Sequence, residues 1–258
     1  MHQVLLYDNS SAAGTIPAGP GNPCDPGHAT ASENAGMPKP SLLSPSELER
    51  SSVVANNTMN RERGLAGVNS YARELGLDPL ARLRGRPAPS WLDLCSGEGR
   101  ALREAASALP ADAVLTGVDL VGPLVPRPAP PALEEIVASV STWTPARTYD
   151  LITCVHGLHY VGDQLGLLSR AASWAAGDGL LCAHFDPDSV RWTDGSAAGR
   201  TAVTALRAVG FEYSPRHHRL TLRGGRSVDL PFRYVGADPA AGPNYTGQPA
   251  VRSHYAPR

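Results

Sequence analysis

The sequence lacks the features that would direct the protein to a nucleic acid or a membrane. Its formal net charge is -1, so no global positive field is available to hold it on DNA, RNA or an anionic lipid surface. It contains no apolar run of about 18 residues, and the short apolar run at residues 4–7 follows no basic leader. We therefore expect a cytoplasmic protein with no membrane partner, acting on a small molecule.

Cysteine and lysine are also scarce. The four cysteines form no Cys-x-x-Cys pair, and three lie in apolar runs where a buried thiol is common: Cys24, Cys95, Cys154 and Cys182. This spacing indicates neither a disulfide framework nor a zinc site. Lys39 is the only lysine among 23 basic residues, which together with abundant Ala, Gly and Pro is typical of a GC-rich coding genome.

Both ends of the chain have the composition of irregular segments. Residues 1–40 are rich in Gly, Pro, Ser and Asn, and after the first apolar run they show no periodicity, so we expect a disordered tail. Residues 237–258 are rich in Gly and Pro, and we expect an irregular C-terminal tail there. Asn244, Tyr245 and His254 of this tail either fold back as a lid or stay untethered.

Residues 41–88 are predicted to form a helical cap. Ser44 stands at an N-cap position, with Pro45 at the first helical position and Glu47 in the capping-box place. A second stretch with apolar residues at helical spacing follows over residues 60–77.

From residue 90 onward, apolar strands alternate with helical patterns, which is the signature of right-handed βαβ units in a mostly parallel sheet. Strands are expected at 91–94, 114–120, 134–140, 149–156 and 179–185, with helices at 99–109, 162–176 and 195–210. Two last strands are expected as an antiparallel edge hairpin around the 223–226 turn. We predict an α/β fold with a doubly wound, seven-stranded, mostly parallel sheet, in a domain spanning residues 89–236.

The most informative motif is an apolar strand that carries an acid and turns through two glycines into a helix. It reads WLDLCSGEGR over residues 91–100 and contains Asp93, Gly97 and Gly99. Such a turn lets the backbone approach a ligand at the carboxyl end of the strand, where doubly wound folds bind nucleotides. Asp119 closes the next strand, 20 residues after Gly99, where an acid can accept hydrogen bonds from both ribose hydroxyls.

This arrangement resembles the first motif of class I S-adenosylmethionine-dependent methyltransferases, Asp-x-Gly-x-Gly-x-Gly, and the match extends over roughly residues 90–187. The resemblance implies a Rossmann-like methyltransferase fold and S-adenosylmethionine as the cofactor. It also implies that Gly97 and Gly99 flank the methionine part and that Asp119 holds the ribose. Asp93 would orient the turn and contact the cofactor amino group through the backbone or water. Cys95 departs from the pattern, because it takes the place of the family's first glycine.

Adenine recognition lacks the acid that usually follows the third strand in this family. The chain offers Ser139, Ser141, Thr142 and Trp143 instead. Ser141 or the backbone of Thr142 can supply a hydrogen bond, whereas Trp143 either packs on the adenine or belongs to the core. The cap in this family often closes over the cofactor, and within it Arg63 either pairs with the methionine carboxylate or lies solvated at the surface.

The fourth strand delivers His156, His159 and Tyr160 to the mouth of the sheet, with Asp163 as the N-cap of the next helix. This stretch resembles the His-x-Leu-His-x-x-x-Asp run of many small-molecule methyltransferases. Methyl transfer is an in-line displacement on a sulfonium, and an oxygen or nitrogen acceptor can need a base. His156 is the candidate base and His159 the second candidate catalytic residue. Alternatively, both histidines form the cofactor pocket or cap the following helix.

Two further polar groups carry no predicted chemistry. Asp186 and Asp188 follow the fifth strand, where catechol-type methyltransferases hold magnesium, but a Phe-Asp-Pro-Asp-Ser loop is typical of a turn with capping carboxylates. We therefore expect no metal. His217 and His218 are expected at the surface, away from the pocket.

Methylation of a small metabolite is the first hypothesis, in the specialised metabolism of a GC-rich bacterium and with an oxygen, nitrogen or carbon acceptor. No DNA substrate is expected, because neither an Asp/Asn-Pro-Pro-Tyr nor a Pro-Cys motif follows the fourth strand. The alternatives are a catalytically weak binding or regulatory relative, or an RNA methyltransferase, although the basic clusters at 82–86 and 216–226 lack interleaved aromatics. A nicotinamide dinucleotide is disfavoured because Leu102 stands where its fingerprint needs a small residue. The oligomeric state stays open.

Overall fold

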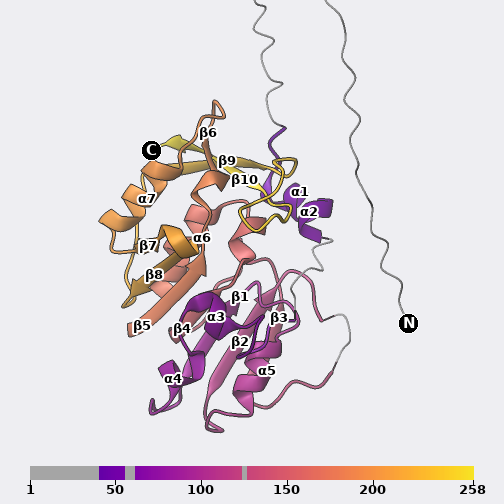
Figure 1. The fold of residues 1–258 in the computed structure, drawn as a ribbon, viewed down its shortest axis with the longest axis vertical. Helices are drawn as coiled ribbons and strands as arrows, with labels where there is room; N and C mark the ends of the chain where they lie inside the picture. The colour runs from indigo at the N-terminus through magenta and orange to yellow at the C-terminus, as the bar shows by residue number, and fades with distance from the viewer. Residues whose placement is uncertain (1–40, 56–61, 124–126) are drawn as a thin grey trace, which may run out of the picture. The chain divides into compact units, whose positions relative to one another are not determined.

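The computed structural model describes residues 41–55, 62–123 and 127–258. The predicted disordered tail over residues 1–40 lies outside the described residues, as do the cap residues 56–61. The ribbon from residue 41 to the C-terminus forms the unit described below (Figure 1).

A seven-stranded sheet organises this unit, with strand order β3-β2-β1-β4-β5-β8-β7. Its strands are β1 (Ser90–Leu94), β2 (Val114–Asp119), β3 (Leu133–Val137), β4 (Tyr149–Cys154), β5 (Ala175–His184), β7 (Glu212–Ser214) and β8 (Arg219–Arg223). The five strands β1 to β5 pair in parallel, and β8 pairs antiparallel with both β5 and β7. The predicted seven-stranded, mostly parallel sheet with an antiparallel edge hairpin is therefore confirmed. The order reverses between β1 and β4, which makes their carboxyl ends the place for a ligand.

Helices cover both faces of the sheet. They are α1 (Pro45–Glu49), α2 (Ser52–Ala55), α3 (Tyr71–Leu75), α4 (Pro79–Leu83), α5 (Arg100–Ala106), α6 (Gln164–Trp174) and α7 (Gly199–Ala208), with the 3-10 turns η1 (Gly157–Tyr160), η2 (Pro187–Ser189) and η3 (Pro215–His217). Every helix among the described residues is too short or too polar to cross a membrane.

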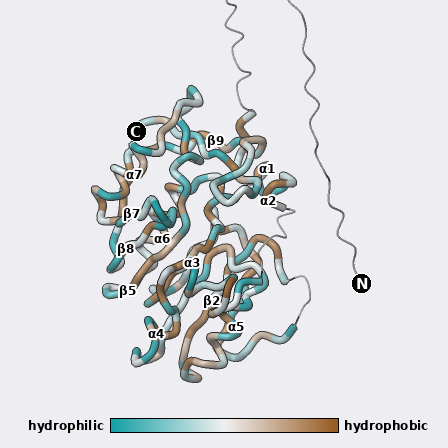
Figure 2. Tube along the Cα trace, in the orientation of Figure 1, coloured by the Kyte–Doolittle hydropathy of each residue, from teal (hydrophilic) through white to brown (hydrophobic). Residues whose placement is uncertain are grey.

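Strand β1 shows why the sheet buries both of its faces. Alternate residues of a strand point to opposite faces, so Leu92 and Leu94 belong to the buried cluster that includes α6 and α7, whereas Trp91 belongs to the cluster that includes α3, α4 and α5. All five β1 residues are buried, as expected for a parallel strand covered on both sides. Hydrophobic stretches of the trace accordingly run along the central strands (Figure 2).

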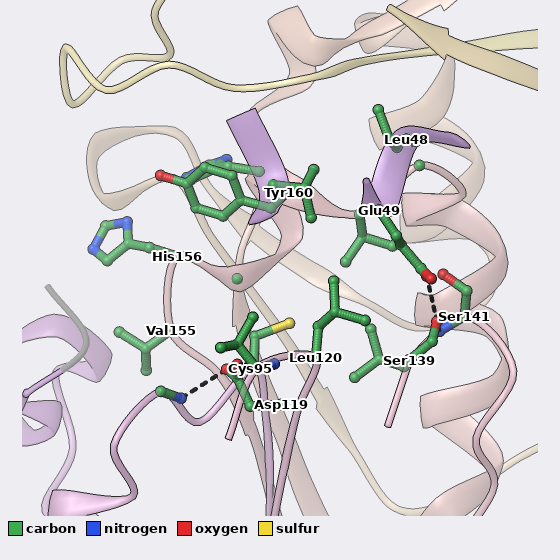
Figure 3. Close-up of a pocket in the computed structure, with 18 of the residues that line it drawn as sticks. Leu48, Glu49, Cys95, Asp119, Leu120, Ser139, Ser141, Val155, His156 and Tyr160 are labelled. Atoms are coloured by element: carbon green, nitrogen blue, oxygen red, sulfur yellow. Dashed lines mark hydrogen bonds between the residues drawn. The ribbon is translucent and has the colours of Figure 1, made fainter. Parts of the chain in front are cut away.

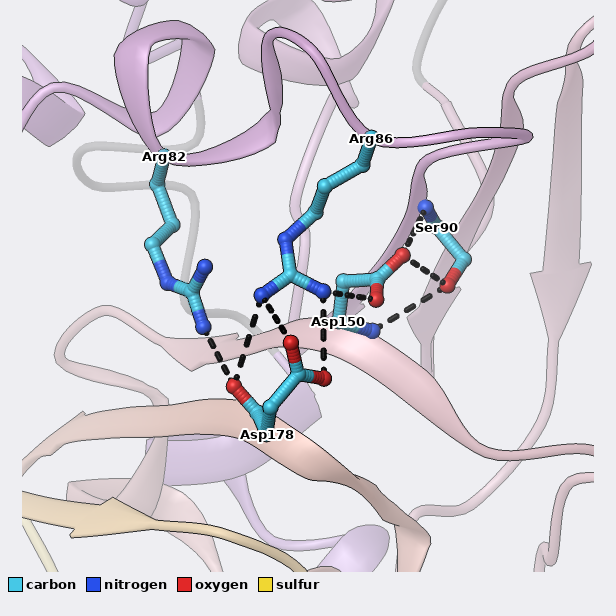
Figure 4. Close-up of polar contacts among 5 residues, drawn as sticks. All are labelled: Arg82, Arg86, Ser90, Asp150 and Asp178. Carbon is cyan, nitrogen blue, oxygen red and sulfur yellow. Dashed lines mark hydrogen bonds and ion pairs between the residues drawn. The ribbon is translucent and has the colours of Figure 1, made fainter.

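An ion-pair cluster joins the cap to the amino ends of the parallel strands (Figure 4). Arg86 donates to the Asp150 carboxylate at 2.6 Å and to the Asp178 carboxylate at 2.7 Å. Asp150 also accepts from the Ser90 amide at 2.8 Å, and Arg82 donates to the carbonyl of Asp178 at 2.6 Å. Two arginines of the basic cluster at 82–86 are therefore engaged within the fold.

The hairpin expected around the 223–226 turn is wrong in its position. The edge hairpin is formed by β7 and β8 with η3 between them, and β9 (Phe232–Asp238) joins a separate three-stranded sheet, of order β6-β10-β9. The amides of Gly224 and Gly225 donate to the carbonyls of Gly179 and Ala176. These bonds dock the turn on the start of β5, so the chain leaves the large sheet instead of doubling back along β8.

The expected irregularity of residues 237–258 is also wrong in part. Strand β10 (Arg252–Pro257) pairs in parallel with β6 (Val190–Trp192) and antiparallel with β9. Tyr255 of β10 is buried, and its hydroxyl accepts from the Leu165 amide at 3.0 Å and donates to Asp163 at 3.2 Å. The composition of this segment did not indicate a strand, because the contacts that stabilise it are made with residues about 90 positions earlier in the chain.

We expect Tyr255→Phe to lower the free energy of unfolding by about 1–3 kcal/mol, because the buried Leu165 amide loses its hydroxyl acceptor. Tyr234→Phe is the matched control, since the buried Tyr234 hydroxyl has no partner among the described residues. Its loss should leave stability unchanged or higher. Urea unfolding of both variants measures the difference, and equal losses in the two would contradict this account of β10.

Candidate functional site

A pocket lined by described residues opens at the carboxyl ends of β1, β2 and β4 (Figure 3). Its space, counted together with the open solvent at its mouth, is about 1160 Å³. The turns after these strands form its base, while α1, α2 and the loop at residues 244–248 contribute to its walls.

The turn after β1 depends on three residues in the left-handed backbone region. Cys95, Gly97 and Gly99 have φ values of 58°, 62° and 65°. Gly97 lines the pocket, and its amide donates to the Asp119 carboxylate at 2.8 Å. The other Asp119 oxygen accepts from the Val121 amide at 3.0 Å, so this acid at the end of β2 holds the turn at the end of β1.

Of the residues predicted to bind the cofactor, Cys95 and Asp119 also line the pocket, whereas Gly99 does not. Gly99 begins α5, and a Cβ there would come within 2.8 Å of the Glu135 carboxylate. Cys95 adopts the backbone of a glycine, and a hydrogen bond with Cys154 holds the pKa of its thiol well above the usual value. The departure from the glycine pattern thus leaves the turn intact.

Asp93 lies beneath the pocket and does not line it. Its carboxylate is buried and accepts from the hydroxyls of Tyr71 and Thr153, each at 2.6 Å. Thr153 in turn accepts from the Trp91 indole at 2.7 Å. Burial raises the pKa of Asp93 to about 7. The hydrogen bonds of this acid therefore connect β1 to β4 and to α3.

The chain after β3 brings only part of its predicted adenine site to the pocket. Ser141 lines the pocket, but Thr142 does not, and Trp143 packs edge-on against Trp174 with ring centroids 5.9 Å apart. Trp143 therefore belongs to the core, the alternative left open by the sequence.

Glu49 of α1 is a pocket residue that sequence reasoning missed. Its carboxylate accepts a hydrogen bond from the Ser139 hydroxyl, and both residues line the pocket (Figure 3). The Ser141 amide donates to the same Ser139 oxygen at 3.1 Å. No sequence signal linked Glu49 to Ser139, because 90 residues separate them.

His156 follows β4 with a left-handed φ of 58° and lines the pocket together with His159. Its Nε2 lies 3.0 Å from the Glu74 carboxylate, and its Nδ1 lies 3.3 Å from the Tyr245 hydroxyl. His184 stacks on the His156 ring at a centroid distance of 4.1 Å. The two predicted histidines thus belong to a larger group to which α3, β5 and the C-terminal loop contribute.

The pKa values of this group follow from hydrogen bonding and burial. The hydrogen bond from His156 lowers the pKa of Glu74 to about 2. Burial lowers the pKa of His159 and that of His184 to about 3, so both rings are neutral near pH 7. Neither ring nitrogen of His159 has a partner among the described residues, although this buried side chain lines the pocket.

The expected surface position of His218 is wrong, although His217 is exposed. His218 is half-buried and stacks on Tyr245 at a centroid distance of 3.8 Å. Asn244 lines the pocket beside Tyr245, so this part of the C-terminal segment folds back. His254 does not join it, because it lies in β10 near the carbonyl of Trp192.

The remaining predicted polar residues divide between the pocket and its surroundings. Arg63 lines the pocket, and its side chain is only 11% exposed, with Nε 3.8 Å from Glu74 Oε1, so the solvated alternative is wrong. Asp186 accepts from the Asp188 amide at 3.0 Å, which is the predicted turn. Asp163 caps α6 through the Gly166 amide at 2.9 Å.

Comparison with known proteins gives a family match over most of the sheet. The sequence pattern of a family described as a methyltransferase domain matches residues 68–224. No curated protein matches the chain.

Several solved structures resemble part of the chain. An amino pentose methyltransferase from Micromonospora echinaspora, solved with S-adenosylmethionine, is 21% identical, with 45% of this chain and 50% of that chain covered and a TM-score of 0.34. Coclaurine N-methyltransferase, solved with S-adenosylhomocysteine, is 23% identical, with 40% and 31% covered and a TM-score of 0.32. A phosphoethanolamine-type N-methyltransferase from Haemonchus contortus is 17% identical, with 55% and 35% covered and a TM-score of 0.39. The chain thus spans half or less of the length of these structures.

The buried Asp93 predicts a characteristic dependence of stability on pH. Tyr71, Asp119 and Cys95 are titratable groups that interact with it. The unfolded chain releases the Asp93 proton near its ordinary pKa of about 3.9, whereas the folded chain keeps it to about pH 7. The free energy of unfolding of the wild type, minus that of Asp93→Asn, should therefore fall as pH rises from about 4 to about 7. Above about pH 7 this difference should stay constant.

Urea unfolding of both proteins between about pH 5 and pH 8 measures this difference. The relative slope should not exceed about 1.4 kcal/mol per pH unit, the limit for one proton. A difference that is constant across this range would show that Asp93 is ionised in the folded protein.

Proposed function

The chain belongs to the methyltransferase domain family, and we propose that it transfers a methyl group from S-adenosylmethionine to a small-molecule acceptor. The observation that carries the proposal is the hydrogen bond from the Gly97 amide to Asp119, which places a carboxylate and a left-handed turn together on the pocket wall. Both lie at the carboxyl ends of adjacent parallel strands, where this class of sheet binds nucleotides.

The residues on the pocket wall fit the cofactor. The Asp119 oxygens accept from the Gly97 and Val121 amides, and this carboxylate would also accept from the ribose hydroxyls of the cofactor. Cys95 and Gly97 border the space for the methionine part. Arg63 also lines the pocket and would pair with the methionine carboxylate.

We propose that Glu49 takes the role of the adenine-binding acid that the chain lacks after β3. Its Oε1 accepts from Ser139, and its Oε2 would accept from the adenine amino group. Ser141, which lines the same part of the pocket, supplies a further polar contact. Helix α1 would then close over the cofactor, because Glu49 belongs to the cap and not to the sheet.

S-Adenosylmethionine supplies an electrophilic methyl group on a sulfonium centre. The protein's own contribution is to hold the acceptor in line with that group and to exclude water. The pocket is lined by His156, His159 and Tyr160. Asn244 and Gln248, which belong to the loop that folds back, line it as well. His159 offers two unpartnered ring nitrogens there, which suits it to contact the acceptor. The role of His156 as a base stays a prediction.

Asp119→Ala should weaken binding of S-adenosylhomocysteine by about 10-fold or more, because hydrogen bonds to a charged group contribute about 1.5–3 kcal/mol each. Isothermal titration measures the affinity. Asp178→Ala is the matched control, since this exposed carboxylate lies at the opposite, amino-terminal end of β5. Equal affinities of the Asp119 variant and the wild type would contradict the proposed cofactor site.

Glu49→Gln tests the adenine contact separately. We expect this substitution to weaken the binding of S-adenosylhomocysteine by about 10-fold, because the amide is a poorer acceptor for the adenine amino group than the carboxylate. S-Inosylhomocysteine lacks that amino group, and its affinity should not fall in the variant. The assignment is wrong if the substitution weakens both ligands equally.

A further inference from the structure

Three elements that are distant in the sequence bring metal-binding side chains together beside the pocket. Glu74 comes from α3, His156 follows β4, and His184 is the last residue of β5. One ligand atom from each lies within 4.8 Å of the others. Among the described residues, no other group of three His, Cys, Asp or Glu side chains meets this condition.

We propose that Glu74, His156 and His184 form a binding site for a divalent transition metal ion of the Zn²⁺ or Co²⁺ type. Two imidazoles and one carboxylate are the donor set that such ions prefer, whereas Mg²⁺ and Ca²⁺ prefer oxygen ligands alone. The proposal is independent of the methyltransferase activity, because it rests on these three side chains and not on the cofactor wall.

The spacing of the donor atoms fits a tetrahedral site. With metal–ligand distances of about 2.0–2.1 Å, neighbouring donors of a tetrahedron lie about 3.3–3.4 Å apart. Glu74 Oε2 lies 3.0 Å from His156 Nε2 and 3.7 Å from His184 Nε2, on either side of that value. A simple hydrogen-bonded pair explains the first distance but not the second, since 3.7 Å exceeds hydrogen-bond range.

The surroundings assign a role to each Glu74 oxygen. Both histidines approach Oε2, whereas Arg63 Nε approaches Oε1 at 3.8 Å. The metal-facing oxygen is therefore not the one nearest to the competing positive charge. The Tyr245 hydroxyl lies 3.3 Å from His156 Nδ1, the position at which metal-bound imidazoles usually have an outer partner.

Metal binding requires a rearrangement of the two rings. His156 and His184 are stacked with an interplanar angle of 3°, and an imidazole lone pair lies in the plane of its ring. One ring must therefore tilt out of the stack so that both lone pairs meet at the metal. His156 lines the pocket, so an open fourth position beside it is accessible to water or to an acceptor heteroatom.

Titration of the chelator-treated, tag-free full chain with Co²⁺ tests the proposal directly. We expect one equivalent to bind with the intense visible absorption of a tetrahedral site, and excess Zn²⁺ to displace it. Glu74→Gln and His184→Phe should each weaken Co²⁺ binding by at least about 10- to 100-fold, the loss caused by removing even an outer-shell partner. Phenylalanine keeps a ring for the stack on His156 but offers no ligand atom.

His217→Ala is the matched control, because this exposed histidine lies outside the group and should leave Co²⁺ binding unchanged. Circular dichroism and titration with S-adenosylhomocysteine check that each variant is folded. The proposal is overturned if no stoichiometric Co²⁺ spectrum forms, or if both ligand variants keep the wild-type affinity. If the wild type forms the Co²⁺ spectrum but does not bind S-adenosylhomocysteine, the result counts against the proposed cofactor site alone.

Discussion

The buried carboxylate of Asp93 holds together the elements from which the site is built. Its two hydrogen bonds, from Tyr71 and Thr153, join β1 to α3 and to β4. Helix α3 carries Glu74, and β4 leads directly to His156. The position of this carboxylate, which never reaches the pocket, therefore controls how the side chains beside the pocket meet. Such a group is costly to bury unless its hydrogen bonds are made, and both are made here.

Two adjacent turns concentrate backbone strain at the mouth of the sheet. Cys95 after β1 and His156 after β4 both have a φ of 58°, a conformation that costs a residue other than glycine about 1 kcal/mol or more. The turns also pack tightly, because a Cβ at Gly157 would come within 2.4 Å of Cys95 Cβ. Both strained residues and Gly97 line the same pocket.

The second sheet explains how the end of the chain returns to the site. Strand β10 pairs with both β6 and β9, and Tyr255 anchors it to the start of α6. The loop between β9 and β10 then lies over the pocket, with Asn244 on its wall and Tyr245 between His218 and His156. The pairing of β9 with β10 thus holds both ends of this loop.

The sequence by itself determined the fold class, the glycine turn after β1 and the position of the acids on its two sides. These features are local: apolar periodicity, glycines and Asp119 are read within about 30 residues, and βαβ units place them at one edge of a parallel sheet.

The sequence misplaced the antiparallel edge hairpin. A two-glycine turn is compatible both with a hairpin and with docking on β5. Only the long-range hydrogen bonds of Gly224 and Gly225 decide between these two arrangements. Only the tertiary structure decided that Glu49 meets Ser139 and that Glu74, His184 and Tyr245 surround His156. Such pairs lie on different elements, the hydrogen-bonded ones 82 to 90 residues apart, and no local propensity records which side chains those elements will bring face to face.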